Sequence, residues 1–253
     1  MTAPSILAIY AHPDDESLVA GGVLARHAAA GARTAVVTAT WSPHSHRAAE
    51  LADALGVLGA GEPRMLGYAD FRIPDSAPGQ PRFCDAPLEE SVGRTVSHIR
   101  AFRPDVIVTH DAYGSSGHPD HRHTHRVTLL AAHAAGLDGL YPEAGPAWQP
   151  RALYFSAHPR RASGALADLL SGAGKLLHTV PDDRVTARVD VRPWLDRKWA
   201  AIRAHRSETV RGRSLPALLS GIPPREREAV LGTEWFTRHD PGSVHRGLHE
   251  LVP

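Results

Sequence analysis

The chain has 253 residues, of which 42% are hydrophobic and 22% charged, with a formal net charge of +1. This composition is enough for a full hydrophobic core, and the balanced charge argues against nucleic acid or an anionic membrane as a partner. Cys84 is the only cysteine, so no disulfide forms within the chain, and no apolar run approaches the roughly 18 residues that span a bilayer. We therefore expect a cytoplasmic globular protein. Whether it forms a homo-oligomer is left open.

The first predicted element is a buried strand over residues 6–10, which ends at His12. Asp14, Asp15 and Glu16 follow, where a helix would begin. Carboxylates favour a helix N-terminus for electrostatic reasons alone, so a charged first turn is the simplest interpretation. An imidazole beside carboxylates at the carboxyl end of a parallel strand nevertheless lies where open α/β sheets bind ligands. Histidine and aspartate together are donors that suit Zn²⁺.

Helical and strand patterns alternate through the first 160 residues or so. We predict helices over 18–30, 46–58 and 88–102, and strands over 34–40, 64–66, 106–109 and 153–156. The proline-rich residues 71–87 predict a loop. Such alternation is typical of an α/β protein, here a Rossmann-like three-layer αβα fold with a mostly parallel sheet.

A second polar segment follows the strand at 106–109 and reads His118-Pro119-Asp120-His121. Pro119 suits the first position of a helix, which we expect to run from about residue 121 to 135. His118 and His121 are three residues apart and can share one face of this helix. One of them can therefore bind a metal while the other faces a substrate.

The pattern weakens towards the C-terminus. We predict a strand over 185–191 and a helix over 194–205, followed from 211 by a segment rich in Arg, Gly and Pro in which Trp235-Phe236 is an isolated apolar anchor. These residues form an irregular C-terminal subdomain, about 161–253, beside a core of about 5–160. We expect a single domain over 1–253.

Two segments together resemble the signature of the PIG-L, or LmbE-like, family of zinc-dependent de-N-acetylases. They are Ala11-His12-Pro13-Asp14-Asp15-Glu16 after the first strand and His118-Pro119-Asp120-His121 about a hundred residues later. Weaker similarity lies at 36–40, 47–51, 66–70, Lys198 and 204–207. The resemblance covers roughly residues 5 to 210.

The resemblance implies a metal-dependent hydrolase that removes an acetyl or other acyl group from an N-acyl amino sugar or a related small-molecule conjugate. His12, Asp15 and His121 would hold Zn²⁺, although Fe²⁺ also suits this donor set. Three protein ligands leave a position open for water, whose pKa zinc lowers to about 7. Asp14, next to a ligand, would be the general base.

Four further residues have roles that the resemblance implies. His118 would stabilise the developing oxyanion or donate a proton to the leaving amine, and Asp120 would orient it. An acetamide needs such help because it is a poor electrophile with a poor leaving group. Arg47 and Asp70 match positions that bind the sugar, although each could instead form a surface ion pair.

Two departures from the family pattern concern the substrate. The family commonly has a Tyr two residues before the second motif, where this chain has Ser116, and Tyr113 is a candidate substitute. The loop at 41–46 also departs from the common Gly-Glu-x-Gly pattern, and its His44 and His46 are either surface residues or substrate contacts. We expect these differences to affect substrate preference more than chemistry.

The other histidines near the motifs have simpler interpretations. His123 and His125 are expected on a solvated helix face because alternate helical positions do not converge. His110 is either an outer partner of the metal ligands or a buried core histidine. His205 is explained by its place at a helix C-terminus and is left out of the site.

Two other classes of function stay open. Two histidines and one carboxylate also form the donor set of non-haem iron oxygenases, although a neighbouring base and acid fit hydrolysis better. A non-catalytic sugar-binding protein on the same fold is the other alternative. A dinucleotide site is excluded because no G-x-G-x-x-G opens the first helix and three carboxylates occupy the phosphate position.

Overall fold

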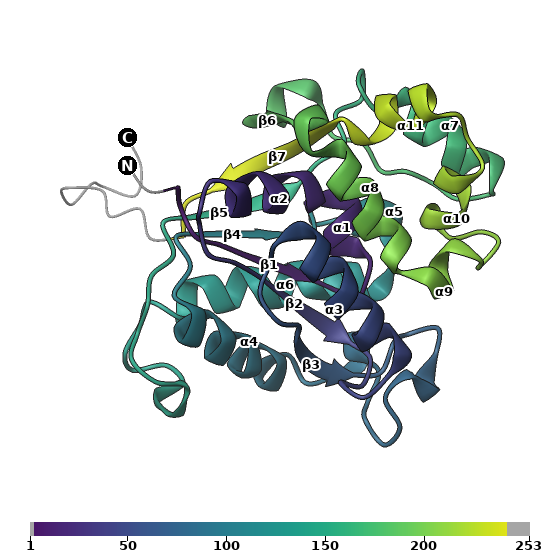
Figure 1. Cartoon of the computed structure of the whole chain (residues 1–253). Helices are drawn as coiled ribbons and strands as arrows, with labels where there is room; N and C mark the ends of the chain where they lie inside the picture. The colour runs from purple at the N-terminus through teal and green to yellow at the C-terminus, as the bar shows by residue number, and fades with distance from the viewer. Residues whose placement is uncertain (1–2, 242–253) are drawn as a thin grey trace.

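The computed structural model describes residues 3–241 and contains one seven-stranded sheet with the order β3-β2-β1-β4-β5-β7-β6 (Figure 1). The strands are β1 (Ile6–Tyr10), β2 (Thr34–Thr40), β3 (Arg64–Tyr68), β4 (Val106–Thr109), β5 (Ala152–Ser156), β6 (Ala187–Asp190) and β7 (Thr233–His239). Strands β1 to β5 pair in parallel, whereas β7 runs antiparallel to both β5 and β6. The predicted α/β class and mostly parallel sheet are confirmed.

Eleven α-helices lie within the described residues. They are α1 (Asp15–Val19), α2 (Gly21–Ala29), α3 (His46–Leu58), α4 (Leu88–Phe102), α5 (Gly114–Gly117), α6 (Pro119–Ala134), α7 (Gly164–Gly172), α8 (Leu195–Ala204), α9 (Arg206–Thr209), α10 (Leu215–Ser220) and α11 (Pro224–Leu231). Between residues 3 and 241, no helix is long and apolar enough to cross a membrane.

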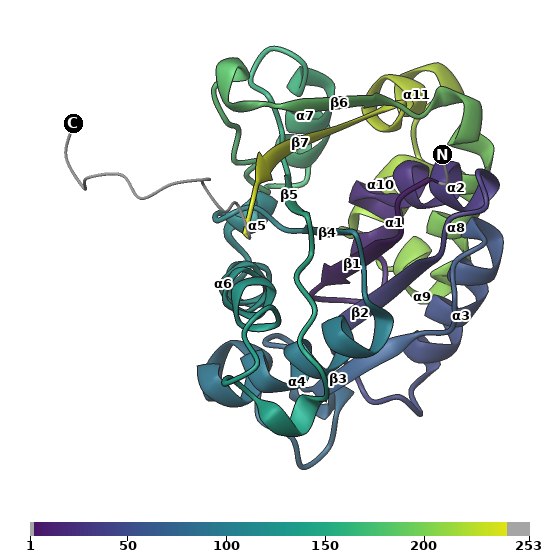
Figure 2. The same cartoon turned by 90° about the vertical axis from the view of Figure 1, so that its left-hand side faces the viewer.

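The side chains of β1 show how the three layers form. All five residues of this strand are buried, as expected for a central parallel strand. Leu7 and Ile9 belong to the core cluster with α4 and α6, whereas Ile6, Ala8 and Tyr10 belong to the cluster with α2, α3 and α8. Alternate residues thus face opposite helical layers, which gives the αβα sandwich seen in Figure 2.

The strand order places the ligand crevice. From β1 the chain moves outward through β2 to β3, and from β4 it moves the other way to β5. The connections therefore diverge between β1 and β4, and the carboxyl ends of these two neighbouring strands form the crevice of an open α/β sheet. Both signature motifs follow these strand ends.

The helix predicted over 18–30 was wrong in its continuity, since the chain breaks at Ala20 into α1 and α2. The backbone of Ala20 leaves the helical region (φ −138°), and Glu234 accepts the N–H groups of Gly22 and Val23 at 2.8 Å each. These bonds satisfy a new helix N-terminus. A Cβ at Gly22 would lie 2.4 Å from Val191, so the glycine at this position lets α2 approach the C-terminal region closely.

Trp235 and Phe236 are not an isolated anchor, because they belong to β7. Phe236 pairs with Ser156 of β5 on one side and with Ala187 of β6 on the other. The last strand therefore enters the sheet between two strands that precede it, a long-range pairing that local composition does not show. The strand predicted over 185–191 is confirmed as the shorter β6.

Other predicted bounds shift by a few residues. The third strand extends to Tyr68, and the helix expected from residue 121 begins at Pro119. The proline-rich residues 71–87 contain two short 3₁₀ turns, and Phe83 among them is fully buried. This loop is therefore packed against the core instead of extending into solvent.

Candidate active site

Three potential metal donors converge at the crevice from the two motifs. His12 follows β1, Asp15 is the first residue of α1 and His121 lies in the first turn of α6. His12 Nδ1 lies 3.1 Å from His121 Nε2 and 3.3 Å from Asp15 Oδ2, and the last two atoms are 3.4 Å apart. Donors about 2.1 Å from a tetrahedral ion would be about 3.4 Å apart, so the three separations fit one shared ion.

The outer hydrogen bonds of the two imidazoles determine which nitrogens face the centre. His12 Nε2 lies 3.2 Å from the Asp120 carboxylate, and His121 Nδ1 donates to the Gly114 carbonyl at 3.1 Å. Both acceptors lack protons, so each outer nitrogen carries a ring proton, and when both rings are neutral the lone pairs of His12 Nδ1 and His121 Nε2 face each other. Two facing lone pairs beside the Asp15 carboxylate repel each other, and either a proton or a metal ion between them removes this repulsion. The residues fit a divalent metal ion.

The pKa shifts of His12 and Asp15 also favour a positive charge between the three donors. Burial alone would lower the pKa of His12, but the carboxylates of Asp120 and Asp15 hold it well above its ordinary value. Burial would likewise raise the pKa of Asp15, yet His121 and His110 hold it well below the usual range. The cluster thus keeps its carboxylate ionised and attracts a cation.

Asp120 is held by the proline-rich loop. Its carboxylate accepts the backbone N–H groups of Phe71 at 2.9 Å and Cys84 at 3.1 Å, and its side chain is fully buried. The compact fold of this loop therefore determines how Asp120 orients His12. Atoms of His12, Asp70, His118 and Asp120 also lie within 4.8 Å of one another, which makes them a rival metal cluster.

His118 presents a hydrogen-bond donor to the cavity. Its Nδ1 accepts the backbone N–H of Asp120 at 3.3 Å, so the ring proton resides on Nε2. Burial, with the nearby His12, lowers the pKa of His118 to about 4, so the ring is neutral at neutral pH. The Asp120 carboxylate lies 3.8 Å from His118 Nδ1, so Asp120 orients His118 through its main chain instead of its side chain.

Asp14 lies in a strained backbone conformation beside the three donors. Its φ of 133° is unfavourable for a residue with a Cβ, and such strain is common at functional sites. Glu16 accepts the Asp14 N–H at 3.0 Å, and its other carboxylate oxygen lies 2.8 Å from His205 Nε2. Burial raises the pKa of Asp14 to about 7. The Glu16–His205 pair therefore holds the turn that carries Asp14.

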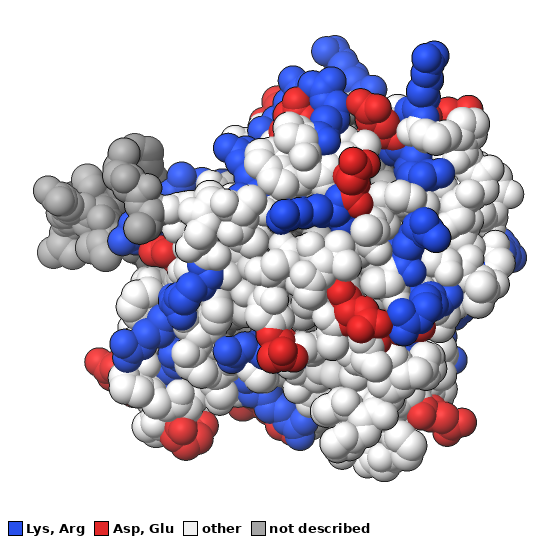
Figure 3. Space-filling view, in the orientation of Figure 1, with Lys and Arg blue, Asp and Glu red and all other residues white. Residues whose placement is uncertain are grey.

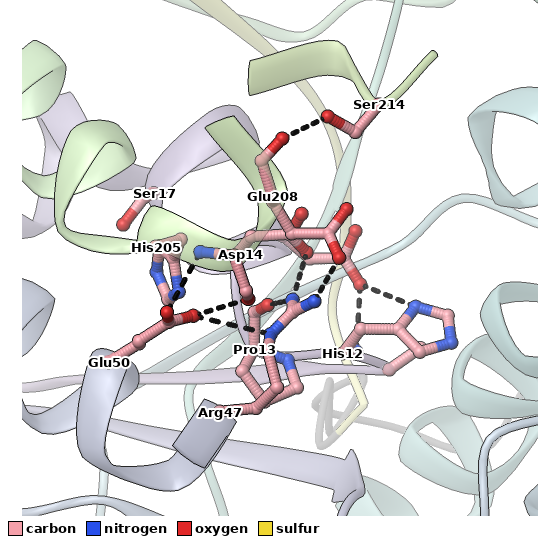
Figure 4. A network of polar contacts seen from close by, with 12 residues as sticks. His12, Pro13, Asp14, Ser17, Arg47, Glu50, His205, Glu208 and Ser214 are labelled. Atoms are coloured by element: carbon pink, nitrogen blue, oxygen red, sulfur yellow. Dashed lines mark hydrogen bonds and ion pairs between the residues drawn. The ribbon is translucent and has the colours of Figure 1, made fainter. Parts of the chain in front are cut away.

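Arg47 is buried in a polar network next to Asp14 (Figure 4). Its guanidinium donates to the Pro13 carbonyl and to Glu208, and it lies 3.5 Å from Asp14 Oδ1. Glu50 lies 3.8 Å from Arg47 Nε and also binds Ser207. Arg47 thus forms a buried network, not the surface ion pair that was its alternative.

Asp70 lies on the Nε2 side of the His12 ring, whereas Asp15 and His121 lie on the Nδ1 side. Its Oδ1 accepts the N–H of Arg72 at 2.6 Å, which holds the turn after β3, and its Oδ2 lies 3.3 Å from His12 Nε2. Asp70 is also buried, so the surface-pair interpretation is wrong for this residue too. The structure brings every candidate residue from the two motifs, together with Arg47 and Asp70, to the wall of one cavity or, for Asp120, directly behind it.

Several histidines differ from expectation. His123 was expected in solvent but is buried against Phe83, with ring centroids 4.7 Å apart, and His125 is half-buried with its Nδ1 3.0 Å from the His110 carbonyl. His205 was explained by a helix dipole but is fully buried on Glu16. His123 and His125 are covered because α6 packs against α4 and the proline-rich loop as well as the sheet, so it has more than one buried stripe.

The remaining polar candidates separate into two groups. His110 stacks on His121, with centroids 4.0 Å apart, and its Nε2 lies 3.3 Å from Asp15, so it is an outer partner of the donors. His44 and His46 are exposed. Tyr113 is exposed and stacks on His178, so it does not replace the missing Tyr in the cavity.

Four polar residues that support the site or line the cavity have no role predicted from the sequence. They are Glu16, Glu50, Glu208 and His158. His158 had a usable signal, since it closely follows the carboxyl end of β5, as His110 follows β4, and Glu16 is part of the first motif. The three glutamates lie on helices, where an acidic residue is ordinarily solvated.

The donors open into a cavity of about 790 Å³. One part of its wall carries the motif residues, and another part, the C-terminal wall, comes from α7, α10, α11 and the loops between α7 and β6 and between α9 and α10. The C-terminal region therefore completes a cavity whose donors come from the N-terminal half.

Comparisons with known proteins agree with this geometry. The family model for GlcNAc-PI de-N-acetylase matches residues 7–132. A 1D-myo-inositol 2-acetamido-2-deoxy-alpha-D-glucopyranoside deacetylase from Geodermatophilus obscurus is 34% identical, covering 91% of this chain and 90% of the relative. Among solved structures, the N,N'-diacetylchitobiose deacetylase from Pyrococcus horikoshii has a TM-score of 0.66 at 18% identity, covering 94% of this chain and 85% of its own.

The fold alone does not decide the reaction. The 4-carboxy-2-hydroxymuconate hydratase GalB from Pseudomonas putida has a TM-score of 0.60 at 18% identity, covering 98% of this chain and 100% of its own. Sequence similarity and the family match define the class more narrowly, as a hydrolase that releases acetyl groups from amide nitrogen. The chain belongs to the PIG-L, or LmbE-like, family of de-N-acetylases.

Proposed function

We propose that this protein removes the acetyl group from an N-acetylglucosamine conjugate with the help of Zn²⁺ held by His12, Asp15 and His121. The observation that carries the proposal is the pair of imidazole nitrogens, 3.1 Å apart beside the Asp15 carboxylate, whose outer ring nitrogens lie against the Asp120 carboxylate and the Gly114 carbonyl. We infer the amino sugar from the relatives, since the matching Geodermatophilus obscurus deacetylase is named for a 2-acetamido-2-deoxy-glucopyranoside.

The metal ion, when bound, would polarise the acetamide carbonyl and lower the pKa of an attacking water towards about 7. Asp14 accepts the proton of that water, because its carboxylate lies next to the ligand Asp15 and lines the same cavity. The strained turn at Asp14 aims the carboxylate before substrate arrives, so little reorganisation is needed during the reaction.

His118 acts on the opposite side of the reacting carbonyl. With Nδ1 occupied by the Asp120 N–H, its Nε2–H donates a hydrogen bond to the oxygen that gains negative charge. Because the His118 ring is neutral at neutral pH, we assign it to oxyanion stabilisation and not to protonation of the leaving amine. The proton that Asp14 takes from water then serves the leaving amine.

Asp70 and Arg47 hold the sugar hydroxyls. Both side chains are buried and line the cavity on either side of the donors. Ionised carboxylates accept, and guanidinium groups donate, the hydrogen bonds that hydroxyls form. Arg47 already binds Asp14 and Glu208, so it also ties sugar binding to the position of the base.

An iron oxygenase uses the same two-histidine, one-carboxylate donors, but it has no use for a base held in a strained turn. The test is amine release from a panel of N-acetylglucosaminides, with oxygen uptake measured in parallel on wild type and Asp15→Ala. We expect amine from wild type, none from the variant and no oxygen uptake. Oxygen uptake would support the oxygenase, and sugar binding without amine release would support a binding protein.

A further inference from the structure

Besides Arg47 and Lys198, which lie on helices, the part of the cavity wall that is formed by loops carries four basic side chains around Lys175. Arg72 comes from the loop after β3, Lys175 from the loop after α7, and Arg211 and Arg213 from the loop between α9 and α10. Three chain segments that are far apart in sequence thus bring cations to one place. Basic side chains are prominent around α9 and α10 on the right-hand part of the surface in Figure 3.

These cations have too few anionic partners. Within residues 3–241, the side chains of Arg72 and Lys175 form no ion pair, and Arg213 donates to the carbonyl of Ala173. Arg211 lies 3.1 Å from Glu208, but Glu208 already pairs with Arg47. The Glu208 carboxylate therefore pairs with two arginines. Among the described residues, Arg72, Lys175 and Arg213 have no carboxylate partner of their own.

The unpaired basic side chains affect the protonation of Lys175. Its partial burial, together with Arg72, Arg211 and Arg213, lowers the pKa of its ammonium, although Glu208 opposes this shift. Like charges near one another in a partly buried site repel, and an anion placed between them removes this repulsion. The protein's net charge is only +1, so the cluster is a local feature and not part of a generally basic surface.

We propose that this wall binds a negatively charged group, a phosphate or a carboxylate, on the part of the substrate attached to the amino sugar. The inference rests on the proposed function, because it assumes that the sugar occupies the metal side of the cavity. A cavity of about 790 Å³ has room for more than one sugar ring. Arginine and lysine side chains are the usual partners of phosphate and carboxylate groups.

If the basic side chains bind an anionic group, the enzyme should have a higher kcat/KM for a charged substrate than for a neutral glycoside. We would compare kcat/KM for N-acetylglucosamine 1-phosphate, the carboxymethyl α-glycoside of N-acetylglucosamine and its uncharged methyl α-glycoside. We expect at least about tenfold preference for one or both charged substrates, and the preference should decline with added salt. Comparing the two charged substrates shows whether the site prefers phosphate or carboxylate.

Lys175→Gln and Arg72→Gln should each lower kcat/KM about tenfold for the preferred charged substrate and leave the methyl glycoside unchanged. Lys175→Arg should retain most of the preference. Arg126→Gln is the matched control, since Arg126 is an exposed residue of α6 that does not line the cavity. Equal use of charged and neutral substrates by wild type, or variants that change nothing, would overturn the inference.

A direct binding measurement keeps the two proposals separable. Calorimetric titration of wild type and Lys175→Gln with N-acetylglucosamine 1-phosphate, the carboxymethyl glycoside and the methyl glycoside does not depend on turnover. Absence of amine release from all substrates would contradict the proposed function alone. Wild type that binds a charged ligand more tightly than the neutral one, with the difference lost in Lys175→Gln, would still support the anion site, whereas equal affinities would reject it.

Discussion

The two walls of the cavity are built in different ways. At the carboxyl ends of β1 and β4, His12, Asp15 and Asp120 are 8%, 7% and 0% exposed, and each takes part in several polar contacts. On the C-terminal wall, Arg211 and Arg213 are exposed and Lys175 is half-buried. One wall is held by the sheet and its loops, and the other is formed by short helices and side chains with few partners.

This difference indicates a division of labour. Groups that meet a transition state work best when their positions are set beforehand, which the strand ends provide. Groups that select a substrate can lie on segments that vary without harm to the sheet. We therefore expect substitutions on the strand-end wall to reduce turnover, and substitutions on the C-terminal wall to change substrate preference.

The largest effect should come from removing a metal donor. His121→Ala should reduce bound metal from about one ion per chain to a small fraction and lower kcat/KM by at least about 10³-fold, because the ion would supply several kcal/mol of charge stabilisation. Metal analysis and amine release measure both. His133→Ala, an exposed residue of the same helix, is the control. Equal metal content in wild type and His121→Ala would reject this donor.

Asp14→Asn should have the next largest effect. The amide cannot accept the water proton, so kcat should fall by about 10² to 10⁴-fold while the metal stays bound. Steady-state kinetics and metal analysis on the same sample separate the base from a ligand. A variant that loses activity only in proportion to lost metal would contradict the role of Asp14 as a base.

A smaller loss should follow from loosening the turn that carries Asp14. His205→Gln leaves Glu16 buried without its cationic partner, so the free energy of unfolding should fall by about 3 kcal/mol. The displaced base should lower kcat about tenfold to a hundredfold with KM little changed. Denaturant unfolding and kinetics on folded protein measure the two effects.

The control for His205→Gln is its neighbour. Arg206→Gln removes only an exposed ion pair with Asp53, which contributes less than about 1 kcal/mol, so both stability and kcat should be nearly unchanged. If His205→Gln lost stability but kept full kcat, the Glu16–His205 pair would be structural only.

The smallest effect should lie on the C-terminal wall. Leu166 lies on α7 and lines the cavity. Leu166→Ala should raise KM about three- to tenfold for glycosides with a large aglycone, leave kcat unchanged and have no effect on free N-acetylglucosamine. Leu140→Ala, at an exposed position away from the cavity, should change neither. A fall in kcat instead would mean that this wall takes part in the chemistry.

The sequence predicted the N-terminal half of the fold well, for a physical reason. A central parallel strand is buried on both faces, so β1 and β4 appear as short apolar runs, and the motifs follow directly where such strands end. Residues placed this way converge because neighbouring parallel strands share one edge. His12, Asp15 and His121 could therefore be expected together before their distances were known.

The C-terminal half could not be predicted in the same way. Strand β7 pairs between β5 and β6, so its place depends on contacts made about 80 residues earlier in the chain with β5. Glu16 and His205 are buried only because they meet each other across α1 and the end of α8. A charged side chain on a helix looks solvated until its partner is known, and that partner is not a local property.

Anomalous diffraction from crystals loaded with one equivalent of zinc would locate the metal ion relative to its three proposed donors. We predict a single peak at about 2.0–2.2 Å from His12 Nδ1, Asp15 Oδ2 and His121 Nε2. The rival cluster of His12, Asp70, His118 and Asp120 would instead use His12 Nε2. A peak on that side of the His12 ring, away from Asp15 and His121, would show that Asp15 and His121 are not metal donors.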